Sequence, residues 1–198
     1  MELMKKENTS LVVFKKRPVA LLIAALMISS STLYSVHRTL GAVCQEISDG
    51  FYTGVVDSGW GTTRRSINSQ LTKRSEAAAG LVTVLNQFDE LSDISDALRT
   101  AQRNLRDNST GIQQSYKLNK QLSEAFTVAL QALNELNLNE RDQRMIDEFK
   151  TSFNGAQSVI DSSGYNESVR EFERSTLNVF PTNILKGIVG GKLPQLFE

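Results

Sequence analysis

Apolar residues recur at helical spacing in four consecutive stretches between residues 67 and 160. Residues three and four positions apart lie on one face of an α-helix, so each stretch predicts an amphipathic helix with one buried face. The stripes are Ile67, Leu71, Leu81, Val82, Leu85 and Phe88; Ile94, Leu98 and Leu105; Ile112, Leu122, Phe126 and Leu133; and Ile146, Phe149, Phe153 and Ile160. Turn-like segments at 89–93, 108–111 and 137–140 separate them. The pattern predicts an all-α fold in which residues 63–186 form an antiparallel four-helix bundle.

One polar residue, Asn119, takes an inward position in the third stripe. A buried amide without a partner costs about 1–3 kcal/mol of desolvation. We therefore expect Asn119 to hydrogen-bond a neighbouring helix or to face a wet edge, in a structural role.

The fourth stripe is interrupted by Asp-Ser-Ser-Gly at residues 161–164 and then resumes, displaced, with Tyr165, Val169, Phe172 and Phe180. This displacement predicts a kink or a local bulge. Pro181 lacks an N–H and restricts the residue before it, so we expect the helix to stop after Phe180 and its last turns to close the bundle. The tail, residues 187–198, is apolar but too short and glycine-broken to span a membrane, and is expected to cover one bundle end or touch lipid.

The N-terminal part of the chain has a different pattern, in which residues 18–36 carry no charge. About 20 apolar residues cross a bilayer core, so this run favours a transmembrane anchor. The alternative is a signal peptide cut after Ser31, because the densest part, 19–28, has the size of a signal core. The basic residues Lys5, Lys6, Lys15, Lys16 and Arg17 precede the run. The positive-inside rule therefore puts residues 1–17 in the cytoplasm and the rest of the chain outside it.

Residues 37–62 are expected to connect the anchor to the bundle. Gly50, Gly54, Gly59 and Gly61 fall here, and glycine weakens a helix, so we predict a flexible or kinked connection with Trp60 in the core. Cys44 follows the branched Val43 rather than the small residue that lipid attachment requires, which favours an ordinary thiol over a lipoprotein site.

Charge and composition exclude several functions. The 22 Lys and Arg residues balance the 22 Asp and Glu residues, so there is no net positive charge to favour nucleic-acid binding. The single His, His37, and the single Cys argue against hydrolytic triads and zinc sites. No phosphate-binding glycine loop or dinucleotide fingerprint is present in the sequence. We therefore predict no enzymatic activity, no metal and no cofactor.

Two blocks of the sequence resemble the LemA family. The first runs from Ile67 through the basic pair Lys73-Arg74 to Leu81-Val82; the second joins Tyr165-Asn166 to Phe180-Pro181 and Ile184-Leu185. The chain departs from the family where 76–80 replace an Asp-Leu-Ile-Pro-Asn run, which predicts a straighter helix, and where serines at 162 and 163 replace an arginine. The motif residues carried over are Leu71, Arg74, Leu81, Val82, Tyr165, Asn166, Val169, Phe180 and Pro181.

The resemblance implies a single-pass protein of the bacterial cell membrane with an extracytoplasmic bundle, associated by analogy with envelope proteins such as membrane proteases. The function predicted first is action through protein or membrane-surface contacts. The alternative is a bundle that senses a small molecule or peptide held between its helices. The Tyr165, Asn166, Phe180 and Pro181 motif has two interpretations: a groove near one bundle end, or a structural set in which the aromatic residues pack, Asn166 bonds locally and Pro181 ends the helix.

Overall fold

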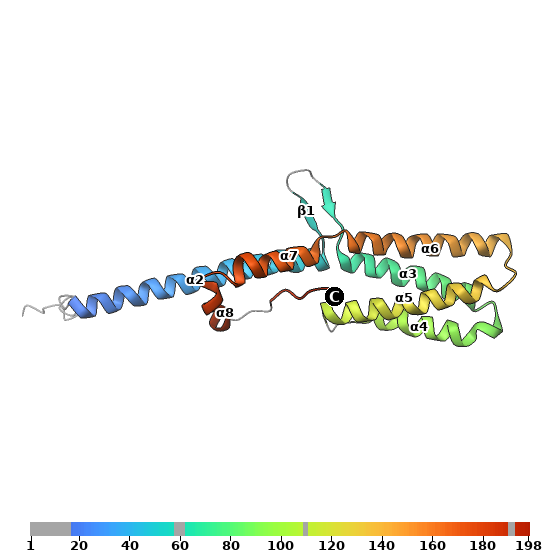
Figure 1. The fold of residues 1–198 in the computed structure, drawn as a ribbon, viewed down its shortest axis with the longest axis horizontal. Helices are drawn as coiled ribbons and strands as arrows, with labels where there is room; N and C mark the ends of the chain where they lie inside the picture. Colours follow the sequence, from blue (N-terminus) through green and yellow to red (C-terminus); the bar gives the residue numbers. More distant parts are fainter. Residues whose placement is uncertain (1–16, 58–61, 109–110, 190–192) are drawn as a thin grey trace, which may run out of the picture.

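The computed structural model describes residues 17–57, 62–108, 111–189 and 193–198, and these are mostly helical, with one short hairpin and an irregular segment at 193–198 (Figure 1). The elements in chain order are α2 (Arg17–Tyr52), β1 (Val55–Asp57), β2 (Thr62–Arg64), α3 (Ile67–Leu85), η1 (Asp89–Leu91), α4 (Ser92–Arg106), α5 (Ile112–Asn134), α6 (Glu140–Asp161), α7 (Tyr165–Phe172), the π-helical turn η2 (Glu173–Leu177) and α8 (Thr182–Val189). The strands pair antiparallel, with Val55 opposite Arg64. The predicted helical fold class is confirmed at this level.

The four predicted stripes correspond to helices α3 to α6, which lie side by side (Figure 1). We call these four helices the helical body. Helix α3 packs along α4 and α6, and α4 packs along α5. The buried faces are those of the stripes: Leu81, Leu98, Leu122 and Leu133 are fully buried, and the rings of Phe126 and Phe153 stack between α5 and α6 with centroids 3.8 Å apart. Apolar burial of this kind is the main stabilising term of such a body.

Helix α3 begins and continues as its residues predict. The Ser66 side chain caps its first turn by accepting a hydrogen bond from the Ser69 N–H. The helix then runs without interruption through 76–80, where the family pattern would have a proline. Gly80 allows close approach to α6, because a Cβ there would lie 2.4 Å from Cε1 of Phe149.

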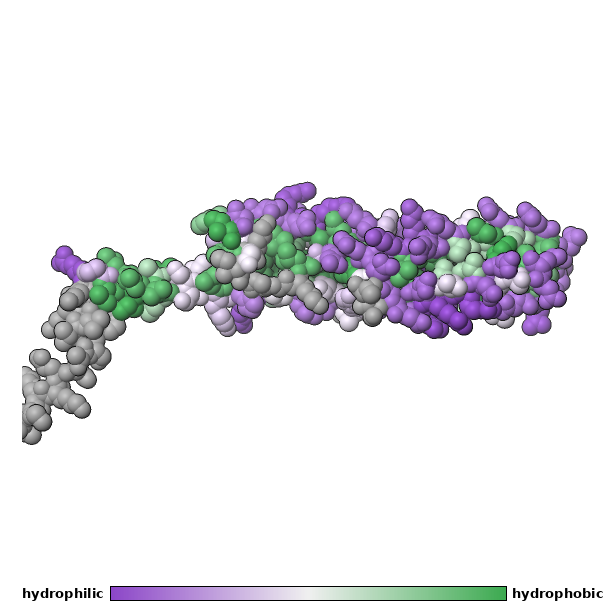
Figure 2. Space-filling view, turned by 90° about the horizontal axis from the view of Figure 1, so that it is seen from below, coloured by the Kyte–Doolittle hydropathy of each residue, from purple (hydrophilic) through white to green (hydrophobic). Residues whose placement is uncertain are grey.

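Helix α2 is long and apolar enough to cross a membrane, by length and composition. Its apolar residues Leu21, Leu22, Leu26, Met27 and Ile28 are exposed. In Figure 2 the first part of α2, which projects beyond α7 and α8, is mostly hydrophobic, whereas the surface of the helical body is mostly hydrophilic. The two ends of this one helix therefore meet different surroundings.

The break expected from the glycines at 49–62 is present after Tyr52, whereas the first part of the connection is helical. Helix α2 continues unbroken to Tyr52, where Phe51 is buried, and the chain turns at Gly54, whose φ of 85° suits glycine. The connection is therefore sixteen more residues of helix (37–52) followed by the hairpin, because the apolar side of α2 is covered by later segments of the chain. Trp60 and the basic residues before Arg17 lie outside the described residues.

The segment after α6 follows the prediction of bundle closure only in its first turns: Tyr165 and Val169 pack in the core cluster of the helical body, whereas the later residues pack on α2. The predicted kink is present at Gly164, which has a φ of 69°. That turn directs α7 along α2, so α7 does not continue α6 (Figure 1). The displaced apolar face buries Phe172 and Leu177 against Leu40 of α2. Helical spacing alone does not tell which neighbour covers a face.

The ending of this segment also differs from the prediction. The helical segment stops at Leu177, before Pro181, and α8 begins immediately after that proline. The peptide between Phe180 and Pro181 is cis. Phe180 is 75% exposed, so its predicted place in the core is wrong. The π-helical turn at 173–177 precedes this ending, and α8 packs against α2 beyond it.

Candidate functional site

Tyr165 and Asn166 lie together at the first turn of α7 and hold the C-terminal tail. The Tyr165 hydroxyl donates a hydrogen bond to the carbonyl oxygen of Gln195 at 2.8 Å. The Asn166 side chain bonds both backbone groups of Phe197: Nδ2 donates to the carbonyl at 2.9 Å, and Oδ1 accepts from the N–H at 2.8 Å. The local hydrogen bond expected for Asn166 is therefore wrong, because its partner lies 31 residues away.

The junction between α7, α2 and the helical body also encloses the Phe197 side chain, which is 6% exposed. Its ring centroid lies 5.8 Å from that of Phe51 on α2 and 5.3 Å from that of Tyr116 on α5, the latter edge-on. Arg170, one turn after Asn166 on α7, pairs with the Glu198 carboxylate. We define the tail site as Phe51, Tyr116, Tyr165, Asn166 and Arg170. It brings together residues of α2, α5 and α7.

Burial affects the chemistry of the Tyr165 hydroxyl. Desolvation, with a smaller contribution from Tyr52, raises the pKa of Tyr165 to about 12. The hydroxyl therefore keeps its proton at neutral pH and serves as a hydrogen-bond donor rather than a base.

The predicted covering of one bundle end by the tail is confirmed for residues 193–198.

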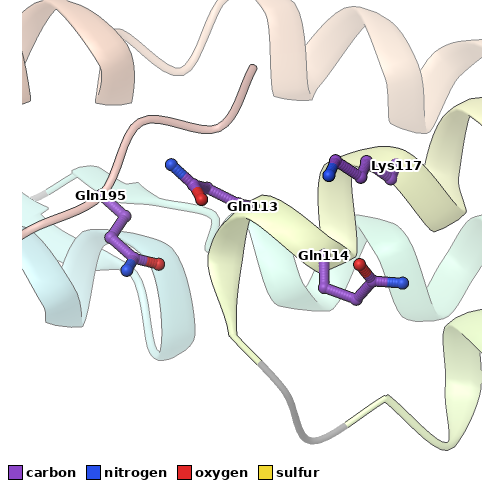
Figure 3. Close-up of a pocket in the computed structure, with 4 residues that line it drawn as sticks. All are labelled: Gln113, Gln114, Lys117 and Gln195. Carbon is purple, nitrogen blue, oxygen red and sulfur yellow. The ribbon is translucent and has the colours of Figure 1, made fainter.

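An open depression of about 400 Å³ lies beside this docked tail (Figure 3). Gln113, Gln114 and Lys117 on the first turns of α5 line one side, and Gln195 of the tail lines the other. Amides and an ammonium group offer hydrogen bonds and one positive charge, without a nucleophile and base arranged for catalysis. The depression makes the tail accessible along one edge.

Arg74 forms a second polar centre, inside the helical body. It is 2% exposed, and its guanidinium lies 3.9 Å above the ring centroid of Phe153. Its Nη1 donates to the side-chain oxygens of Asn119 and Gln157, and its Nη2 donates to Ser123 Oγ at 2.7 Å. The predicted interhelical partner of Asn119 is thus confirmed, and it is a cation from α3.

Burial lowers the pKa of Arg74 to about 10, and the negative charge of Asp161 opposes this shift. Gln157 links Asp161 to the network, because Nε2 of Gln157 donates a hydrogen bond to Oδ1 of Asp161 at 2.7 Å. Among the buried side-chain nitrogen and oxygen atoms of the described residues, Nε of Arg74 alone has no hydrogen-bond partner. The arginine remains charged at neutral pH and joins α3, α5 and α6.

The remaining predicted motif residues divide into two groups. Leu71, Leu81, Val82 and Val169 are buried and act in packing. Phe180 and Pro181 do not join Tyr165 and Asn166, so the proposed aromatic-proline corner of a groove is absent from the tail site. Sequence reasoning missed Phe51, Tyr116 and Arg170, since no spacing relates them. No group of three or more His, Cys, Asp or Glu residues suited to a metal occurs among the residues that the structure describes.

Comparison with known proteins adds no family assignment: no protein-family model matches the chain, and no curated protein and no solved structure is significantly similar to it. The resemblance to the LemA family therefore stays a prediction that depends on the motif residues alone.

Proposed function

We propose that this protein is a LemA-like, single-pass membrane protein of the bacterial cell envelope that acts through protein and membrane-surface contacts. In this proposal the helical body is an antiparallel four-helix bundle held outside the cytoplasm, and it has no enzymatic activity. The observation that carries the proposal is the change in environment along α2, from exposed apolar residues at its start to buried ones at Leu40 and Phe51.

The exposed part of α2 supports insertion into lipid. Leu21, Leu22, Leu26, Met27 and Ile28 are each more than half exposed. Exposed apolar surface costs roughly 25 cal/mol per Å² in water, so a bilayer is the environment that these residues fit. Because α2 continues without a break from the apolar run to Tyr52, the body would be attached to the anchor by one continuous helix.

A second apolar surface supports contact with the membrane itself. Val179, Phe180 and Ile184 are 49%, 75% and 64% exposed. They follow Leu177, which packs in a cluster with Val36 of α2, the last residue of the predicted span. Apolar side chains at that level suit the boundary between headgroups and acyl chains. We infer that this surface, Val179, Phe180 and Ile184, lies on the lipid where α2 leaves the membrane.

Membrane extraction tests the anchor. We expect the wild-type chain to stay with membranes through an alkaline wash, and a variant with Leu22→Lys and Leu26→Lys to be released, since each charge costs about 2.5–3.5 kcal/mol in the bilayer centre. A matched variant with the exposed Val128→Lys on α5 should remain bound. Release of the wild-type chain would contradict the anchor. A reporter fused after Glu198 that was active only in the cytoplasm would contradict the orientation.

Site-directed fluorescence tests the membrane-surface contact. With Cys44→Ser as background, a polarity-sensitive dye is attached at Phe180→Cys or at the control position Val128→Cys, both exposed. Emission is recorded for the full chain in lipid vesicles and, as reference, for a chain without the span in detergent-free solution. We expect the dye at position 180 to emit at shorter wavelength in vesicles than in the reference, and the dye at position 128 to emit at the same wavelength in both. Equal spectra at the two positions in vesicles would overturn the surface assignment.

A further inference from the structure

We propose that the tail site recognises an extended peptide segment of a partner protein in which an aromatic residue is followed directly by an acidic residue. In the free protein the chain's own residues 195–198 occupy the site. This inference names the partner class for the protein contacts of the proposed function and rests on that part of it, but it does not depend on the membrane anchor.

Backbone recognition is the first argument. Asn166 presents one donor and one acceptor to the same residue, Phe197, as a neighbouring strand would, and Tyr165 binds the carbonyl two residues earlier. These three hydrogen bonds all go to main-chain atoms of the tail. Main-chain bonds give affinity for an extended segment without fixing its sequence, which is the usual arrangement in peptide-binding domains.

Selectivity comes from the two side chains that follow. The Phe197 ring enters a space bordered by Phe51, to which it is tilted, and Tyr116, which it meets in the edge-on geometry that aromatic pairs favour. Arg170 pairs with the next residue, Glu198, through its side-chain carboxylate. The position of Phe197 therefore favours an aromatic side chain, and the position of Glu198, next to Arg170, favours a carboxylate. Together they select an aromatic residue followed by an acidic one.

The site is built by elements other than the tail. Val169 is fully buried on the same helix, and Phe172 packs on Leu40 of α2. These contacts fix α7, and with it Tyr165, Asn166 and Arg170, along α2. Phe51 and Tyr116 come from α2 and α5. A site that its scaffold holds in place remains available when its occupant leaves, which is the condition for exchange with a peptide in trans.

A partner protein is a better exchanging occupant than a second copy of this chain. The tethered tail has the advantage of a high effective concentration, so a competitor needs contacts beyond those of residues 195–198. A second copy brings the same tail, and swapping two identical tails adds no new contact at either site. A different protein supplies the same aromatic-acidic pattern with further contacts, such as those along the polar depression lined by Gln113 and Lys117.

Peptide binding to the full chain in detergent micelles tests the proposal. The probe is a fluorescent, C-terminally amidated peptide with the sequence of residues 193–198, and anisotropy reports binding. In the Phe197→Ala chain the tethered competitor is weakened, so we expect affinity for the probe to rise at least about tenfold over wild type. A probe with Ala in place of the phenylalanine should not bind. Equal affinity of the two chains for the probe would overturn the proposal.

Charge reversal shows whether binding occurs at this site. In the Phe197→Ala background, Arg170→Glu should lower the affinity for the probe about tenfold. A probe with Arg in place of the glutamate should restore binding to this variant. Arg174→Glu, on the exposed side of the following turn, is the matched control and should change neither probe. Identical effects of the two reversals, or no restoration, would overturn the assignment. Far-UV circular dichroism confirms that each variant is folded.

Two further outcomes are distinguishable. A wild-type dimer in size-exclusion chromatography with light scattering that disappears in the Phe197→Ala chain would indicate tail exchange between copies and overturn the partner assignment. A monomer supports it. Because the peptide assay uses solubilised protein, its failure leaves the membrane-extraction result unchanged, and release from membranes leaves the peptide result unchanged.

Discussion

The Arg74 network and the tail site each contain polar side chains of the predicted motif, Arg74 in one and Tyr165 and Asn166 in the other, but they differ in what satisfies those side chains. Arg74 is held by Asn119, Gln157 and Ser123, all fixed on helices of the body. Asn166 is held by the backbone of a terminal segment. If a partner is lost, the interior groups stay buried, whereas the groups of the tail site can become hydrated. Removing one hydrogen bond should therefore lower the free energy of unfolding more in the Arg74 network than in the tail site.

Removal of the Arg74 side chain should produce the largest effect. Arg74→Ala leaves the buried side-chain oxygen of Asn119 without its donor, removes one of the two donors to the half-buried Gln157 oxygen, and removes packing on Phe153. We expect a loss of about 3–5 kcal/mol in the free energy of unfolding, because each unsatisfied buried group costs about 1–3 kcal/mol and a cavity adds to this. Urea denaturation of the solubilised chain, followed by helical circular dichroism, measures it.

Arg144→Ala is the matched control for this prediction. Its side chain is 71% exposed and its ion pair with Glu140 is 3.6 Å long, so the loss should stay within about 0.5 kcal/mol. A loss below about 1 kcal/mol for Arg74→Ala would show that the interior network relaxes as easily as the surface does.

Two phenylalanines with similar burial allow a direct comparison of the two regions. Phe126 is 2% exposed inside the body and Phe197 is 6% exposed on the tail. Phe126→Ala should cost about 3–5 kcal/mol, as for other core phenylalanines. Phe197→Ala should cost at most about 2 kcal/mol, because the tail can detach locally without unfolding the helices. Amide hydrogen exchange should then show lost protection in residues 193–198 alone. Equal losses for the two variants would mean that the tail is part of the cooperative core.

The helices of the body could be predicted from sequence because each stripe is a local property with a fixed period. The need of Asn119 for a partner and the break before Tyr165 could also be predicted, since both depend on local chemistry. The buried position of Arg74 could not. It follows Lys73 in a basic pair that indicates a solvated face, and its partners lie 45, 49 and 83 residues away.

The tail site could not be predicted for a related reason. Asn166 and Phe197 are 31 residues apart, and no periodicity links an asparagine to the backbone of a distant segment. The same limit explains the wrong neighbour for α7. Its apolar face has helical spacing whether α2 or the body covers it, and the left-handed Gly164 decides between them. A glycine at a break shows that the direction changes but not where the chain goes.

The two asparagines, one in each region, provide a finer test. Asn119→Ala removes an acceptor from the buried Arg74, so we expect a loss of about 1–3 kcal/mol. Asn166→Ala removes two hydrogen bonds to Phe197, but the freed backbone groups can bind water, and the loss should stay below about 1 kcal/mol. Denaturation of both variants by urea checks the order. A larger loss for Asn166→Ala would reverse the contrast between the regions.

The smallest effect concerns the Tyr165 hydroxyl and its dependence on pH. At pH 7, Tyr165→Phe loses the bond to Gln195, and we expect a cost of about 0.5–1.5 kcal/mol. The pKa of Tyr165 is about 12 in the folded chain, against about 10 for an unfolded tyrosine. At a pH between about 10 and 12, Tyr165 has released its proton in the unfolded chain but still holds it in the folded chain. This group therefore makes the free energy of unfolding of the wild type fall as pH rises.

The stability advantage of wild type over Tyr165→Phe should therefore be constant up to about pH 9 and shrink from pH 10 upward. The lowered pKa of Arg74, about 10, acts in the same range with the opposite sign, because the folded chain there binds fewer protons than the unfolded chain. Arg74 is present in both proteins, so its contribution cancels in the difference. Urea denaturation of the pair from pH 7 to 11.5 measures this difference. A constant difference would mean that the tail leaves the Tyr165 hydroxyl in water, and the tail site would then be open without a partner.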